Sequence, residues 1–239
     1  MKQKATARPK ARIVVIDDHP LLREGLMQLL CNQADLECAG MGDNTADAKR
    51  LVAQFTPHLM ILDLRLKSGD TLDLIKSLRV EHPDVKVLVL SQYDEMLFAE
   101  RVLRAGASGY VMKENATDEI LNAVRRVLAG DIYFSEKIGA SFVRRSLAQK
   151  PDSSRVGVER LSDRELQVFQ LIGASYSTRE IASQFHLSVK TVETHRENIK
   201  SKLNLQSAAE LNEFARNWAH ENLQPHLQPT RTTTKPRQR

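Results

Sequence analysis

The chain has 239 residues, of which 41% are hydrophobic and 27% charged, and its formal net charge is +5. This length supplies enough apolar material for two ordinary domains, each with its own core. No apolar run approaches the roughly 20 residues that span a bilayer, and the N-terminus lacks the apolar segment of a signal peptide. We therefore expect a cytoplasmic protein without a membrane partner.

The two ends of the chain are polar, basic and without hydrophobic periodicity, so residues 1–11 and 223–239 are predicted to be disordered tails. The two cysteines, Cys31 and Cys38, are too few for the disulfide framework of a secreted protein. Because both lie within apolar patterns, we expect them to be buried and reduced.

Residues 12–130 alternate short apolar runs with amphipathic stretches, in which residues such as Leu22, Leu26 and Leu29 share one helix face. Strands that are apolar on both faces and separated by helices are typical of a parallel sheet covered on both sides. We therefore predict a doubly wound α/β domain with a five-stranded parallel sheet. Its predicted strands span 12–17, 36–41, 58–63, 85–91 and 107–113, and its predicted helices span 20–30, 45–55, 70–80, 95–105 and 117–129.

Beyond this domain the pattern changes. Residues 131–157 show little periodicity and are predicted to be a linker. Residues 158–222 show helical patterns only, which predicts a small all-α domain. Ser162 and Ser177 precede two of these helices, each with a Glu three residues later, as in a capping box. The four predicted helices span 162–174, 177–187, 188–203 and 207–221.

Four of the five predicted strands end in polar residues. Asp17 and Asp18 end the first strand, Asp63 the third, Ser91 the fourth and Lys113 the fifth. Ligands of open α/β sheets bind at the carboxyl ends of the strands, so we expect these side chains to converge at one edge. Each of them alone would be explained as a helix cap or a solvated loop residue, but the five together suggest a site.

Crowded carboxylates require a cation, and ligands that are all oxygen favour Mg²⁺. A metal ion, a lysine and a hydroxyl suit the stabilisation of a transferring phosphoryl group, and a carboxylate can itself accept that group. Because Asp17 and Asp18 are adjacent, they can hold a metal ion together while Asp63 stays available. The spacing alone does not identify the accepting acid further.

Residues 12–130 resemble the receiver domain of two-component response regulators. The matching features are the acid pair Asp17 and Asp18, the stretch LMILDLRL around Asp63, and Ser91, Tyr110 and Lys113. The resemblance implies that Asp63 is the phosphoacceptor and that Lys113 pairs with the phosphoryl group or with Asp63. It also implies that Ser91 and Tyr110 rearrange on phosphorylation. The implied Mg²⁺ ligands are Asp17, Asp18 as the main one, Asp63 and the backbone carbonyl of Arg65.

The chain departs from the receiver pattern at two places. Relatives usually carry Pro and Gly in the loop after the acceptor, where this chain has Lys67 and Thr71. Many receivers also have a Pro after the lysine, often with a cis bond, whereas Glu114 follows Lys113 here. A cis bond to a non-proline residue costs about 2.5–4 kcal/mol, so we expect a trans bond.

Residues 158–222 resemble the LuxR-type helix-turn-helix through LSDRELQVFQLI, STREIA and LSVKTVETHRENIKSKL. Both halves together resemble a NarL/FixJ-type response regulator. The resemblance implies a DNA-binding transcriptional regulator, not an enzyme, that is switched by phosphorylation of Asp63 from a sensor histidine kinase. The implied partners are double-stranded DNA, that kinase and a second copy of the chain on DNA, with RNA polymerase as a further candidate.

The second helix of a helix-turn-helix reads bases with its N-terminal part. In the stretch 188–203 the spacing of Val192, Ile199 and Leu203 predicts a core-facing side. The candidate DNA-binding residues are Lys190, Thr191, Glu193, Thr194, Arg196, Glu197 and Lys200. Relatives often carry Lys at the position of Glu193 and favour Gly at the position of Ser175. We expect Ser175 to adopt an unfavourable turn geometry at a tolerable cost.

Three alternatives compete with this interpretation. A haloacid-dehalogenase-type phosphatase expects an acid two residues after its nucleophile, but Arg65 and His19 stand at those positions relative to Asp63 and Asp17. A DNA-binding protein whose receiver no longer accepts phosphate would be expected to lack an acid or Lys113, and none is missing. A nucleotide-binding α/β domain would carry a glycine-rich phosphate loop after its first strand, which this sequence lacks.

Overall fold

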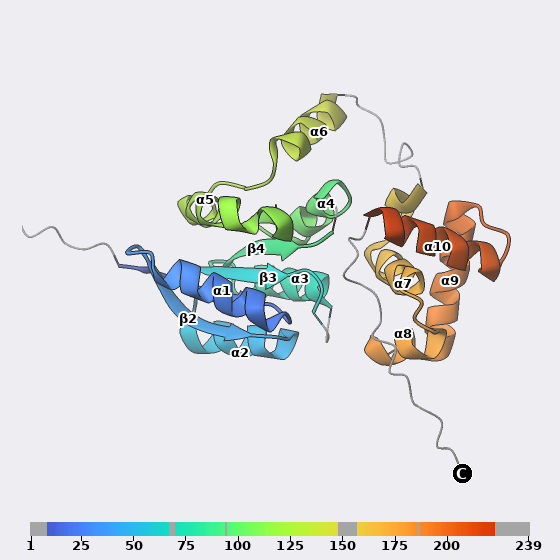
Figure 1. Ribbon diagram of the computed structural model, residues 1–239, viewed down its shortest axis with the longest axis horizontal. Helices are drawn as coiled ribbons and strands as arrows, with labels where there is room; N and C mark the ends of the chain where they lie inside the picture. The colour runs from blue at the N-terminus through green and yellow to red at the C-terminus, as the bar shows by residue number, and fades with distance from the viewer. Residues whose placement is uncertain (1–8, 67–69, 94, 148–156, 186, 223–239) are drawn as a thin grey trace, which may run out of the picture. The chain divides into compact units, whose positions relative to one another are not determined.

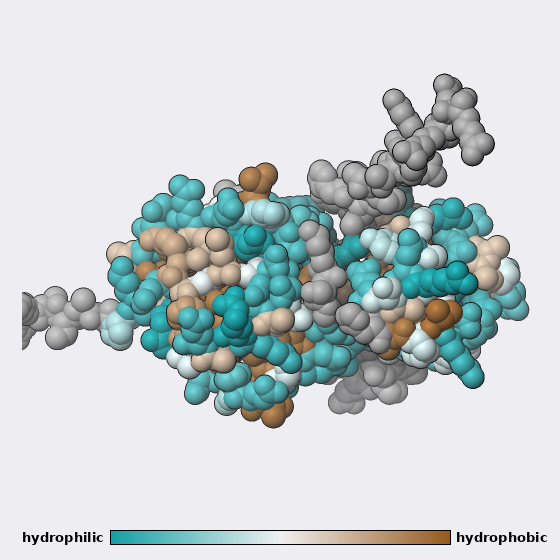
Figure 2. Space-filling view, turned by 90° about the horizontal axis from the view of Figure 1, so that it is seen from below, coloured by the Kyte–Doolittle hydropathy of each residue, from teal (hydrophilic) through white to brown (hydrophobic). Residues whose placement is uncertain are grey.

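A computed structural model describes residues 9–66, 70–93, 95–147, 157–185 and 187–222. The chain divides into two compact units, Met1–Ser154 and Arg155–Arg239, which we describe separately (Figure 1). Both predicted tails, except for residues 9–11, lie outside the described residues, as do Lys67 and most of the C-terminal part of the predicted linker. Hydrophilic side chains cover most of the visible face of each unit (Figure 2).

The first unit is an α/β domain, and the bounds of its predicted strands and helices are correct to within one residue, except that the fifth strand begins two residues later than predicted. It also contains one helix that was not predicted. Its elements are β1 (Ala11–Ile16), α1 (Pro20–Cys31), β2 (Leu36–Gly42), α2 (Thr45–Phe55), β3 (Leu59–Asp63), α3 (Thr71–Glu81), β4 (Lys86–Ser91), α4 (Glu95–Ala105), β5 (Gly109–Met112), α5 (Ala116–Ala129) and α6 (Glu136–Leu147).

The five strands form one parallel sheet in the order β2-β1-β3-β4-β5, which confirms the predicted doubly wound fold. The sheet is built from apolar residues that are buried on both faces. Ile13 and Ile61 belong to a core cluster with α1 and α5, while their neighbours Val14 and Met60 are equally buried on the other face. Because Ile16 pairs with Leu62, β1 and β3 end almost level, so the residues that follow them meet at one edge.

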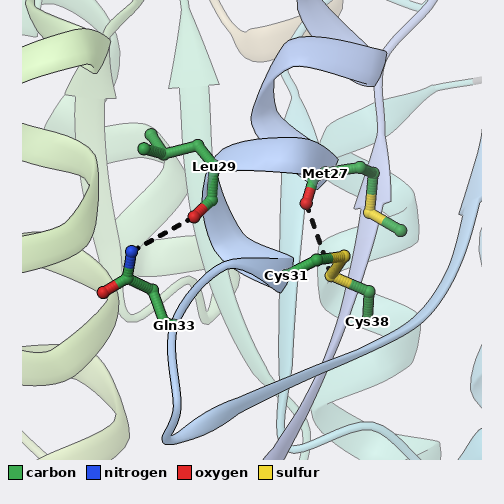
Figure 3. The surroundings of a disulfide bond; sticks show 5 residues. All are labelled: Met27, Leu29, Cys31, Gln33 and Cys38. Atoms are coloured by element: carbon green, nitrogen blue, oxygen red, sulfur yellow. Dashed lines mark hydrogen bonds between the residues drawn. A yellow bond between two sulfur atoms is a disulfide. The ribbon is translucent and has the colours of Figure 1, made fainter.

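The prediction of buried, reduced cysteines is wrong. Cys31 is the last residue of α1 and is exposed, Cys38 lies half-buried in β2, and their sulfurs form a disulfide bond (Figure 3). The turn between α1 and β2 brings the two Cα atoms to 5.6 Å, within the range that a disulfide bridges. The apolar pattern identified the elements correctly, but it could not reveal how the chain reverses between them.

The predicted linker contains structure that its sequence pattern did not indicate. Tyr133 accepts a hydrogen bond from the Tyr110 N–H at 2.8 Å and donates one to the Ser108 carbonyl at 3.0 Å, so it pairs with β5. The helix α6 follows, and Ile138 within it is 1% exposed. An edge strand exposes unpaired backbone groups, and this short addition covers part of the β5 edge.

The second unit is all-helical, as predicted, and each of its four helices matches a predicted one. They are α7 (Asp163–Gly173), α8 (Thr178–Gln184), α9 (Val189–Leu203) and α10 (Ala208–Asn222), preceded by a short 3₁₀ turn at Gly157–Arg160. The capping boxes predicted at Ser162 and Ser177 are both present. Phe169 is fully buried and packs edge-on against Trp218 of α10, with 5.4 Å between the ring centroids.

Two local predictions about backbone geometry are confirmed. Ser175, after α7, has φ 65°, the left-handed conformation that favours glycine. Its N–H bonds the Ile172 carbonyl and the next N–H bonds the Leu171 carbonyl, the pattern that closes many helix C-termini. No cis peptide bond occurs among the described residues, so the bond between Lys113 and Glu114 is trans. None of the described helices is long and apolar enough to cross a membrane.

Candidate functional site

The predicted acidic site lies at the carboxyl edge of the sheet, and its central residues are in direct contact. The Lys113 Nζ atom lies 2.7 Å from Asp17 Oδ2 and 2.9 Å from Asp63 Oδ2. All three side chains are at most 6% exposed. Each side chain comes from the end of a different strand. The apolar residues of each strand are buried in the sheet, and the polar residue stands where the chain leaves the sheet. One ammonium group therefore bridges two buried carboxylates.

Burial raises the pKa of Asp63 to about 6, because the charged form loses its hydration. The Lys113 ammonium acts in the opposite direction, whereas the nearby Asp17 carboxylate raises the pKa of Asp63 further. The Arg65 backbone N–H donates a hydrogen bond to Asp63 Oδ1 at 3.1 Å and favours the ionised form. Asp63 is thus an ionised carboxylate at neutral pH, although burial makes its charged form less favourable than it would be in water.

His19 also belongs to this site, although its position in the sequence did not predict a role there. Its Nδ1 atom lies 2.9 Å from Asp18 Oδ1, 3.0 Å from Asp17 Oδ1 and 3.8 Å from Asp63 Oδ2. The His19 backbone N–H also donates to Asp17 Oδ1 at 2.8 Å. The available signal was its position, directly after the acid pair and directly before the helix that begins at Pro20. That signal was also compatible with a histidine that merely flanks the helix.

The donor atoms present fit a hard divalent cation. One ligand atom from each of Asp17, Asp18, His19 and Asp63 can be chosen such that all four lie within 4.8 Å of one another. Three of these are carboxylate oxygens, the donors that Mg²⁺ prefers. Lys113 is the buried ammonium that faces these acids, so their negative charge exceeds the positive charge held beside them. The residues therefore suit Mg²⁺ better than a softer transition metal.

The predicted switch residues Ser91 and Tyr110 are both buried and are connected through Tyr93. Ser91 Oγ accepts a hydrogen bond from the Tyr93 N–H at 3.1 Å, and the Tyr110 hydroxyl donates to the Tyr93 carbonyl at 2.7 Å. The Tyr93 ring stacks on Phe98 of α4, with 4.9 Å between the centroids. The sequence patterns did not single out Tyr93. The connection extends from the end of β4 to α4.

The candidate DNA-binding residues lie on α9, whose opposite side faces the core. Of the predicted core-facing residues, Val192 and Ile199 are fully buried and Leu203 is partly buried. Lys190, Glu193, Thr194 and Glu197 are exposed, whereas Thr191, Arg196 and Lys200 are partly buried. Helix α9 begins after Ser188, whose hydroxyl accepts from the Thr191 N–H at 3.0 Å.

The side chains of several of these candidates already have partners within the unit. The Arg196 guanidinium donates to Asn212 Oδ1 of α10 at 2.9 Å, and burial lowers the pKa of Arg196. Lys200 pairs with Glu197 at 2.9 Å on the helix surface. Arg196 therefore also helps to hold α10 against α9, a role that the helical spacing did not indicate.

Comparisons with known proteins match both units. Residues 13–125 match the response regulator receiver domain, and residues 159–215 match the luxR family of bacterial regulatory proteins. The oxygen regulatory protein NreC of Staphylococcus carnosus is 37% identical over 208 residues, covering 85% of this chain and 96% of that protein. The transcriptional regulatory protein DegU of Brevibacillus brevis is 34% identical over 209 residues, covering 82% of this chain and 89% of that protein.

Solved structures show the same fold. RcsB of Salmonella enterica serovar Typhimurium, bound to the rprA promoter with the phosphomimetic BeF₃⁻, is 22% identical and has a TM-score of 0.65. That match covers 87% of this chain and 98% of RcsB. A LuxR-family two-component response regulator from Aurantimonas sp. SI85-9A1 is 28% identical, has a TM-score of 0.53, and is matched over 58% of this chain and 99% of its own. The chain therefore belongs to the NarL/FixJ-type response regulators, which join a receiver domain to a LuxR-family DNA-binding domain.

Proposed function

We propose that a sensor histidine kinase phosphorylates Asp63 and that this phosphorylation switches DNA binding by the second unit. The contact of Lys113 with both Asp63 and Asp17 carries the proposal, because it places a buried cation beside a carboxylate at the carboxyl edge of the sheet. Because the proposed ligand is chromosomal DNA, we place the protein in the cytoplasm.

In the proposed reaction an Asp63 carboxylate oxygen attacks the phosphorus of a phosphohistidine. The new O–P bond replaces the N–P bond, and the kinase histidine leaves with its electron pair. Asp17, Asp18, Asp63 and the backbone carbonyl of Arg65 would hold Mg²⁺, which supplies positive charge for the transferring oxygens. Lys113 gives up its contact with Asp63 and pairs with the phosphoryl group, since its ammonium already lies within 3 Å of the accepting carboxylate.

The signal then leaves the site through the residues around Tyr93. We propose that Ser91 moves toward the phosphoryl oxygens and that Tyr110 changes its position as the Tyr93 segment shifts. The support is the hydrogen bond from Tyr110 to the Tyr93 carbonyl and the packing of Tyr93 on α4. A ligand can shift such an equilibrium only through contacts that differ between the two states, and the Ser91 hydroxyl supplies such a contact.

For the second unit we propose that the exposed side of α9 enters the major groove. Lysine and arginine suit phosphates and guanine, and glutamate can accept from cytosine. The proposed contacts are Lys190, Thr191, Glu193, Thr194, Arg196, Glu197 and Lys200. One small unit covers only a short half-site, so two copies are expected on one duplex. RcsB, a structural neighbour, has been solved as two dimers bound to two parallel DNAs.

The test is the site of acyl phosphate formation. Full-length protein is incubated with acetyl phosphate and Mg²⁺, and its mass is measured under conditions that preserve acyl phosphates. We expect one added phosphoryl group in the wild type and none in Asp63→Asn. Asp73→Asn, which changes an exposed acid on α3, is the matched control and should be labelled like the wild type. Labelling of Asp63→Asn at the wild-type level would place the acceptor elsewhere.

A further inference from the structure

The Cys31–Cys38 disulfide lies at the opposite end of α1 from the acidic site. It joins the last residue of α1 to the third residue of β2, across a short turn (Figure 3). A helix rises about 1.5 Å per residue, so the length of α1 separates this bond from Pro20 by roughly 17 Å. The bond is therefore chemically separate from the phosphorylation site.

The two sulfurs differ in their access to solvent. Cys31 ends the helix and is exposed, whereas Cys38 is half-buried and packs against the core cluster beneath α1. A small thiolate in solution can therefore approach Cys31 Sγ more readily than Cys38 Sγ. Access is one of the factors that decide which sulfur of a disulfide is attacked.

The surrounding structure also suits the reduced form. Cys38 Sγ lies 3.5 Å from the Met27 carbonyl oxygen, a distance at which a free thiol can donate a hydrogen bond (Figure 3). Backbone hydrogen bonds hold the turn independently of the sulfurs, since the Gln33 N–H bonds the Leu30 carbonyl at 3.0 Å and the Leu36 N–H bonds the Gln33 carbonyl at 3.3 Å. After reduction, the two thiols therefore stay close enough to reform the bond.

We propose that Cys31–Cys38 is a reversible thiol–disulfide exchange site whose co-reactant is a low-molecular-weight thiol of the glutathione type. In the first step the thiolate attacks Cys31 Sγ, the S–S bond breaks, and Cys38 leaves as a thiolate that takes up a proton. A second thiolate then attacks the small-molecule sulfur of the mixed disulfide and releases Cys31. The protein gains two electrons and two protons, and two small thiols become one small disulfide.

The test measures the redox state of the folded full chain in buffers with graded ratios of reduced to oxidised glutathione. Samples are quenched with acid, alkylated with N-ethylmaleimide after denaturation, and weighed by mass spectrometry. As the ratio of reduced to oxidised glutathione rises, we expect the number of added alkyl groups to change from none to two. The midpoint of this transition should be the same whether the protein starts oxidised or reduced. The proposal would be overturned if the protein carried two alkyl groups at every ratio. It would also be overturned if the disulfide bond were reduced only in denatured protein.

Single variants test which sulfur reacts. In Cys38→Ser the remaining Cys31 should form a mixed disulfide with oxidised glutathione at least tenfold faster than the remaining Cys38 does in Cys31→Ser. The rates in denaturant should be similar, and circular dichroism checks that both variants are folded. An equal or faster reaction of Cys38 in the folded chain would contradict the assignment of Cys31 as the sulfur that is attacked.

Discussion

The Lys113 ammonium lies 2.9 Å from the Asp63 carboxylate, and both side chains are at most 6% exposed. Because Lys113 is not an oxygen ligand, Lys113→Ala should retain Mg²⁺ binding through the three carboxylates. It should lose the change in assembly or DNA binding that follows phosphorylation, since it lacks the ammonium that pairs with the phosphoryl charge in the proposed reaction. Metal titration and sedimentation with and without acetyl phosphate measure the two properties.

Lys76→Ala, at an exposed lysine on α3, is the control for this experiment and should behave like the wild type. Full activation of Lys113→Ala by acetyl phosphate would show that Lys113 does not sense the phosphoryl group.

The raised pKa of Asp63 predicts a pH dependence of stability in metal-free protein. The folded state holds this proton more tightly than the unfolded chain, so the stabilisation is present below about pH 3.8 and is lost as the pH rises through about 6. The shift corresponds to about 3 kcal/mol. Relative to Asp63→Asn, which does not titrate, the wild type should therefore lose free energy of unfolding, by up to about that amount, between pH 4 and 7.

Urea unfolding of both proteins in EDTA at several pH values measures this difference. If the wild type gained stability relative to Asp63→Asn over the same range, Lys113 would outweigh burial in setting the charge of Asp63.

Tyr110→Phe removes the hydroxyl that donates to the Tyr93 carbonyl. The carbonyl is left in a buried environment without this donor, so we expect a loss of about 1–3 kcal/mol in the free energy of unfolding. Tyr176→Phe makes the same chemical change at a residue that is 36% exposed and should stay within about 0.5 kcal/mol of the wild type. Calorimetry of the full chain compares the two, and equal effects would mean that the hydrogen bond contributes nothing measurable.

Ser175→Gly is expected to stabilise the second unit. Ser175 has φ 65°, where a side chain costs about 1–2 kcal/mol, and glycine avoids this cost at the price of a more flexible unfolded chain. We expect a net gain of about 0.5–1 kcal/mol. Ser201→Gly, within α9, should instead lose about 0.5 kcal/mol, because its backbone is helical. Urea unfolding followed by the fluorescence of Trp218, the single tryptophan, measures both. A destabilised Ser175→Gly would contradict the strain argument.

The architecture and the position of the acidic site could be predicted from local sequence patterns. Apolar runs of four residues mark β1, β3 and β4, and the polar residues that end these runs, such as Asp63, must lie at the carboxyl edge of a parallel sheet. The capping boxes of α7 and α8 could be predicted in the same way, because a capping box is a contact between residues three positions apart. Periodicity and capping are local properties, so a single sequence carries them.

Contacts between residues that are distant in the sequence could not be predicted in this way. The ring of His19 turns toward three carboxylates, Tyr133 pairs with β5, and Cys31 reaches Cys38 because a turn of particular shape closes between α1 and β2. Lys113 and Asp63 are 50 residues apart in the chain. Such contacts depend on side-chain directions and on how the helices and strands pack across the core. Hydrophobic periodicity specifies which face of a helix or strand is buried, but not which residues that face contacts.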